Sequence, residues 1–138
     1  MANAFIKIGD YDAAVKMMED GLKQNINNPS FYRKIAQIRI NEGKYNLAIA
    51  VLNKSLKLRK SDDTIYLLGH SYFYNNNIIK AKYFLKKVDI KSNYRSRAIF
   101  LLARIYIIEK NFRELELLMN EMRTDFPDAY AKIIKFLK

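Results

Sequence analysis

The sequence predicts an all-α solenoid of antiparallel helix hairpins, because its landmarks recur at a fixed period, each period has helical spacing and the turns are short. A small residue recurs at intervals of 34, 33 and 34 residues, at Ala2, Ala36, Gly69 and Ala103. A large apolar residue follows at the same intervals, at Tyr11, Tyr45, Ile78 and Phe112. A period in this range is typical of helical repeat arrays.

Each period contains two helices that pack side by side. In the third period Ile65, Leu68 and Tyr72 fall on one helical face, and the following segment repeats this spacing. Residues 74–77 between them are too few for anything but a tight turn, so the two helices are antiparallel neighbours. One hairpin cannot bury its own apolar face, and the units must therefore stack.

The apolar periodicity and the helix start signals give the bounds of the helices. Start signals occur at Asn28 before Pro29, at Ser61 with Asp62, and at Ser92 or Asn93. We expect helices at about 1–8, 11–25, 29–41, 45–59, 62–75, 78–90, 95–109, 112–124 and 128–137.

The turn inside each hairpin needs a residue that tolerates a positive φ angle. Gly9 and Gly43 stand at this position, and Asn76 tolerates it nearly as well. Lys110 occupies the equivalent position in the fourth unit and tolerates it poorly. We therefore expect Asn111 or a different turn to serve there.

These recurring positions resemble the tetratricopeptide repeat. The segments from Gly9 to Ala14 and from Gly43 to Ala48 carry a Gly-x-Tyr-x-x-Ala-like motif, with the alanine one place later. Leu68-Gly69 with Tyr72 resembles the middle of the family's first helix, and Pro127 its closing proline. The resemblance implies a single domain, a right-handed α-solenoid of about 3.5 repeats (about 1–28, 29–61, 62–95 and 96–127) plus a C-terminal capping helix at 128–138.

The two ends of this array differ. Ile133, Phe136 and Leu137 form an apolar stripe that is expected to cover the end of the fourth unit, while Lys132 faces water. The first helix is short and has no unit before it. We therefore expect the N-terminal end to self-associate or to be the cut edge of a longer solenoid.

The composition argues against an enzyme and against a metal or cofactor site. The chain has 138 residues, a single histidine and no cysteine, and its four glycines form no phosphate-binding loop. No apolar run reaches the length of a membrane span. We expect no enzyme activity, no metal and no cofactor, with the cytoplasm as the default compartment.

Positive charge is concentrated in the middle of the chain. Residues 29–106 contain sixteen Lys or Arg against four Asp or Glu, a net charge of +12. Such a segment can attract acidic proteins, nucleic acid or an anionic membrane surface, or it can simply be a solvated face. Lysines of the second helices, Lys80, Lys82, Lys86 and Lys87, are expected on the outer side of the array.

The first helix of each unit is expected to line a concave groove. We expect Tyr66, Phe73 and Tyr74 to anchor a protein ligand, because they lie off the packed stripe of Ile65, Leu68 and Tyr72. The full set of candidate groove residues is Arg33, Gln37, Tyr66, His70, Phe73, Tyr74, Arg97, Phe100 and Arg104.

Family members that grip acidic tails carry Asn and Arg at positions where this chain has Leu67 and Leu101. The resemblance thus implies a different ligand, an apolar or aromatic peptide or helix that also carries acidic residues. The expected function is a non-catalytic scaffold or adaptor that binds another protein.

Two alternatives remain open. The first is an RNA-binding helical-repeat protein that uses the basic middle segment, since 116–122 with Pro127-Asp128 looks somewhat like a pentatricopeptide repeat. The second is a self-assembling structural array.

Overall fold

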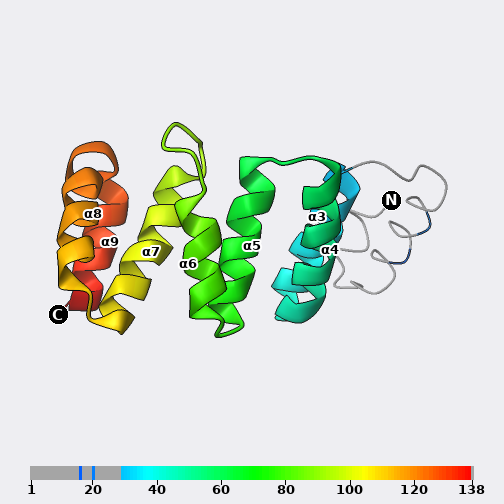
Figure 1. Cartoon of the computed structure of the whole chain (residues 1–138), viewed down its shortest axis with the longest axis horizontal. Helices are drawn as coiled ribbons and strands as arrows, with labels where there is room; N and C mark the ends of the chain where they lie inside the picture. Colours follow the sequence, from blue (N-terminus) through cyan, green and yellow to red (C-terminus); the bar gives the residue numbers. More distant parts are fainter. Residues whose placement is uncertain (1–15, 17–19, 21–28, 138) are drawn as a thin grey trace.

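A computed structural model of the chain describes residues 16, 20 and 29–137. Within these residues every regular element is a helix, and consecutive helices lie side by side in a row that runs from the N-terminal to the C-terminal end of the molecule (Figure 1). The helices are α3 (Pro29–Asn41), α4 (Tyr45–Leu58), α5 (Asp62–Tyr74), α6 (Ile78–Lys86), α7 (Arg95–Glu109), α8 (Phe112–Asp125) and α9 (Pro127–Leu137). The prediction of an all-α solenoid is confirmed.

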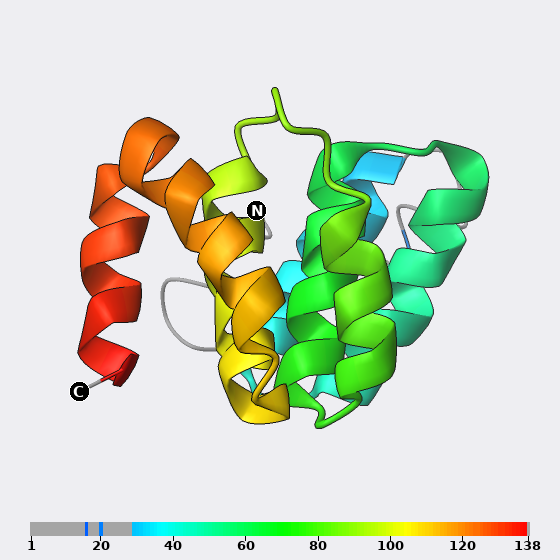
Figure 2. The ribbon, with the colours of Figure 1, turned by 60° about the vertical axis from the view of Figure 1, so that its left-hand side comes forward.

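The helices pack mainly on their neighbours in sequence order, in the hairpins α3–α4, α5–α6 and α7–α8 (Figure 2). The small residues that recur in the sequence lie between the packed helices, since Ala36, Ala48, Ala81 and Ala103 are fully buried. Gly69 belongs to the same series and lies against the side chain of Leu85. Small residues at these positions allow the helix axes to approach closely.

The three hairpin turns share one geometry. Gly43, Asn76 and Lys110 have φ angles of 77°, 65° and 56°. In each turn the residue that follows the one with the positive φ angle donates its backbone N–H to the carbonyl of the residue five positions earlier. Asn111, for example, donates to Tyr106 at 2.9 Å.

The expectation that Lys110 would not adopt this conformation is wrong. Asn111 instead caps α8, since its side chain accepts a hydrogen bond from the backbone N–H of Glu114. The hydrogen bonds of the turn and this cap offset the cost of about 1–2 kcal/mol that a side chain pays in the left-handed region.

Helix α6 ends at Lys86, four residues earlier than the expected helix at 78–90. Residues 87–94 form successive turns. The last of these leads into α7, where Arg95 donates its backbone N–H to the carbonyl of Ser92. Val88 remains buried, so its side chain still packs in the core although the backbone has left the helix.

Helix α9 packs against both α7 and α8 through Ala129 and Ile133, which are buried. The rest of the predicted capping stripe is not buried, because Phe136 is 52% exposed and Leu137 is 44% exposed. Phe136 instead lies beside Phe100 of α7, with ring centroids 5.9 Å apart. One side of α9 therefore faces the surface lined by the first helices of the hairpins.

Candidate functional site

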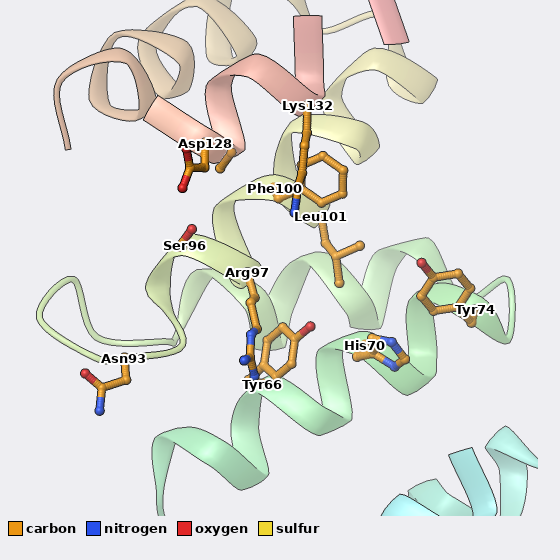
Figure 3. A pocket seen from close by; sticks show the side chains of 11 residues that line it. Tyr66, His70, Tyr74, Asn93, Ser96, Arg97, Phe100, Leu101, Asp128 and Lys132 are labelled. Carbon is orange, nitrogen blue, oxygen red and sulfur yellow. The ribbon is translucent and has the colours of Figure 1, made fainter. Parts of the chain in front are cut away.

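Three adjoining clefts run along the first helices of the hairpins. The cleft between α5, α7 and α9 has a volume of about 420 Å³ (Figure 3). The next cleft, of about 400 Å³, lies between α3, α5 and α7 and shares Tyr66, His70 and Arg97 with the first. The third, of about 230 Å³, reaches Arg33 and shares Gln37 with the second. Together the clefts form one continuous surface, called the groove below.

An aromatic row forms the floor of the groove. Tyr66, His70 and Tyr74 follow one another at i, i+4 and i+8 on α5, so their rings lie in contact along one helix face, each tilted against the next. Tyr94 extends the row at one end, with its ring stacked 5.4 Å from that of Tyr66, and Tyr45 at the other, stacked 5.9 Å from that of Tyr74. The row offers a mainly aromatic surface that also carries hydroxyl groups.

The two central members of the row are neutral at neutral pH. Burial lowers the pKa of His70, and burial raises the pKa of Tyr66, against a smaller opposing effect of the Arg97 charge. The Nδ1 atom of His70 is buried and has no hydrogen-bond partner among the described residues.

Charged side chains flank the aromatic row. Arg33 is held by Asp63 at 3.0 Å, so its charge is already neutralised. Arg97 lies over the Tyr94 ring at 5.5 Å and has no salt bridge to any residue of the described ranges. Lys132 and Asp128 of α9 line the opposite wall (Figure 3). The C-terminal half of the groove thus retains an arginine available to a carboxylate.

The structure does not bring all the predicted residues together. Arg33, Gln37, Tyr66, His70, Tyr74, Arg97 and Phe100 line the clefts. Phe73 and Arg104 do not. The expectation that Phe73 lies off the packed core is wrong, because its side chain is only 7% exposed and belongs to the core.

The side chain of Arg104 packs against aromatic side chains of α5 and α9. Its guanidinium lies between the rings of Phe73 and Phe136, at 4.9 and 4.8 Å, and Nη1 donates a hydrogen bond to the Tyr74 hydroxyl at 3.3 Å. The guanidinium thus has a cation–π contact with each of two rings and a hydrogen bond to a third. Arg104 therefore positions Tyr74 rather than lying open in the groove.

Tyr66 both packs in the core and lines the groove. Its side chain is 9% exposed and part of the core, which contradicts the expectation that it lies wholly off the packed stripe. The same side chain nevertheless lines two of the clefts. Its removal would therefore disturb the core and the groove together.

Several groove residues were missed by the repeat pattern. Tyr94 lies in the turns before α7, where no periodic position predicts a side chain's direction. Lys132 is exposed to water, as expected, and it also lines the groove with Asp128 and Ala129, which was not expected. The i, i+4 spacing of Asp128 and Lys132 on α9 is the one signal that places the two on a common face.

The described residues show no arrangement for metal chemistry. In the ranges 16, 20 and 29–137, no three or more His, Cys, Asp or Glu side chains are grouped to hold a metal ion. In the same part of the chain, no helix has the length and apolar character needed to cross a membrane.

Comparison with known families and structures identifies the class of protein. Residues 30–62 match the tetratricopeptide repeat family. The comparison with curated proteins returns no match. The crystal structure of the MamA protein superposes with a TM-score of 0.81 at 19% identity, over 99% of this chain and 84% of that one.

Two further structures have the same arrangement of helices. YrrB, described as a TPR protein with an unusual peptide-binding site, gives a TM-score of 0.76 at 16% identity, over 98% of this chain and 73% of that one. TTC0263, a thermophilic TPR protein in Thermus thermophilus, gives a TM-score of 0.69 at 18% identity, over 99% of this chain and 79% of that one. The resemblance is confirmed: residues 30–62 match the tetratricopeptide repeat family, and the chain has the fold of tetratricopeptide-repeat proteins.

Proposed function

We propose that this protein is a non-catalytic scaffold that binds a peptide or helix of a partner protein in its groove. The aromatic row carries the proposal, because flat rings on a rigid helix provide a large contact area at a low cost in conformational entropy. The fold supports it as well, since tetratricopeptide repeats are a scaffold for protein–protein interaction.

The chemistry of the groove defines the ligand. Apolar or aromatic side chains of the ligand would pack on Tyr66, His70 and Tyr74, where water is easily displaced. An acidic side chain would pair with Arg97, which has no salt bridge to another described residue. Arg33 is a weaker candidate for such a contact, because the ligand would have to displace Asp63.

Selection from a random peptide library on the full chain tests this proposal. The wild type should enrich peptides that combine aromatic and acidic residues. Tyr74→Ala should weaken the binding of a selected peptide by about thirtyfold, because a lost aromatic anchor costs about 2 kcal/mol. Arg97→Gln should still bind but lose the preference for acidic residues.

Tyr83→Ala is the matched control, because Tyr83 is an exposed tyrosine on α6, away from the groove. If Tyr74→Ala and Tyr83→Ala have equal effects, the groove is not the binding site. If no peptide is enriched and the chain instead retains RNA, the RNA-binding alternative is correct.

Self-association through the N-terminal end stays a prediction, because residues 1–15, 17–19 and 21–28 lie outside the described residues. Light scattering as a function of concentration addresses it directly, and a strict monomer at high concentration would contradict it.

A further inference from the structure

A second surface lies on the outer face of α6, on the side of this helix that faces away from its core contacts. Ala81 and Leu85 of α6 are fully buried, whereas Ile79 is 80% exposed and Tyr83 is 55% exposed. Ile79, Tyr83, Lys86 and Lys87 fall at i, i+4, i+7 and i+8, so they share one helix face. The isoleucine and the tyrosine thus form a small apolar patch on the outer face of the helix.

Lysines surround these two apolar side chains. Lys87 Nζ lies 4.5 Å from the centroid of the Tyr83 ring. A hydrogen bond from Lys87 and the charge of Lys87 lower the pKa of Tyr83, and the charge of Lys60 in the α4–α5 connection adds a smaller effect in the same direction. We define the α6 surface as Lys60, Ile79, Tyr83, Lys86 and Lys87.

The neighbouring charges leave this surface positive. Lys82 is neutralised by Glu109 at 2.7 Å, but no salt bridge in the described ranges involves Lys60, Lys86 or Lys87. The nearest acidic residues in sequence, Asp62 and Asp89, each accept a hydrogen bond from a main-chain N–H and keep their negative charge. An anionic partner would therefore meet three lysines that form no salt bridge with the described residues and that outnumber these two carboxylates.

We infer that the α6 surface binds the anionic surface of a lipid bilayer, with Ile79 and Tyr83 entering the interface and the three lysines contacting the headgroups. Lipid accepts projecting aliphatic side chains without a preformed pocket, and a tyrosine ring suits the boundary between headgroups and acyl chains. Nucleic acid offers the same negative charge but gains little from an exposed isoleucine. The surface lies on the second helix of its hairpin, so a bilayer there leaves the groove of the first helices open.

Sedimentation of the full chain with vesicles tests the inference. Vesicles of phosphatidylcholine mixed with phosphatidylserine should carry the chain down, and vesicles of phosphatidylcholine alone should not. Lys87→Gln should weaken binding about fivefold, and Lys86→Gln with Lys87→Gln about twenty-five-fold, because each lysine near such a surface contributes about 1 kcal/mol. Ile79→Ser should weaken binding about tenfold at unchanged charge.

Matched controls exist on other helices. Leu117→Ser removes an equally isolated exposed side chain from α8, and Lys135→Gln removes an exposed lysine from α9; neither should alter binding. Circular dichroism melting should show that Ile79→Ser remains folded, because this side chain makes few contacts.

The inference is wrong if anionic vesicles do not sediment the chain, or if Ile79→Ser binds as well as the wild type, which would indicate charge attraction alone. It is also wrong if Leu117→Ser loses as much binding as Ile79→Ser. Binding to labelled single- or double-stranded oligonucleotides without binding to vesicles would assign the lysines to nucleic acid instead.

Discussion

Gly69 of α5 lies so close to Leu85 of α6 that a Cβ atom added at Gly69 would be 2.7 Å from Cγ of the leucine. Leu85 is fully buried, so its side chain has no open space into which to move. The glycine is therefore required by the close approach of two helices, although it costs helix stability by itself.

Gly69→Ala should therefore destabilise the protein, in spite of the better helix propensity of alanine. We expect a loss of about 1–2 kcal/mol in the free energy of unfolding, measured by urea denaturation. In a Leu85→Ala background the clash is relieved, and the same change should be neutral or stabilising. An equal loss in both backgrounds would show that the Gly69–Leu85 contact is not the cause.

Phe73→Ala and Tyr74→Ala should separate packing from binding, although the two residues are adjacent in sequence. Phe73 is buried, and its truncation should cost about 3–5 kcal/mol of folding free energy. Tyr74 is 42% exposed, and its truncation should lower stability much less while weakening peptide binding. Thermal melting and peptide titration of both variants check this, and a stable Phe73→Ala protein would contradict its placement in the core.

Lys110→Gly should stabilise the protein by about 1 kcal/mol. Lys110 has a φ angle of 56°, which glycine adopts without the steric penalty of a side chain. Gly43→Ala is the reciprocal change at the equivalent turn, where φ is 77°, and should destabilise by a similar amount. The midpoints of urea unfolding for both variants provide the measurement. A Lys110→Gly protein that is no more stable than the wild type would contradict the left-handed turn.

The stability of the fold should decrease as the pH falls below about 6.5, the ordinary pKa of histidine. Burial lowers the pKa of His70 in the folded state, so below pH 6.5 the unfolded chain binds the proton first and gains stability relative to the fold. Because His70 is the only histidine, His70→Gln should remove this dependence between pH 7.5 and 5.5. An unchanged pH profile in that variant would show that His70 is not the titrating group.

The helices were predictable to within a few residues because the periodic positions are also the packed ones. Ala36, Ala48 and Ala81 recur in sequence and are all fully buried in the structure. The turn at Lys110 could not be predicted from its residue type, because the hydrogen bond from Asn111 and the cap on α8 outweigh the intrinsic preference of lysine.

The groove was predictable only in part, since burial on α5 depends on partners that the repeat pattern does not specify. Phe73 and Tyr74 both lie off the packed stripe in sequence, yet Phe73 is buried in the core whereas Tyr74 is exposed and receives a hydrogen bond from Arg104 of α7. The contribution of Lys132 was also not predictable, because α9 has no equivalent in the preceding repeats.

The linear packing of the helices has a consequence for how the protein unfolds. Each helix is held mainly by its sequence neighbours, so one end of the array can open while the other stays folded. The groove, in contrast, draws side chains from α3, α5, α7 and α9. A ligand that spans the groove would join the first and last of these helices, which do not pack on each other, and separate local openings would merge into a single cooperative transition. Amide hydrogen exchange would then slow in all four helices at once, in α9 as much as in the central α5.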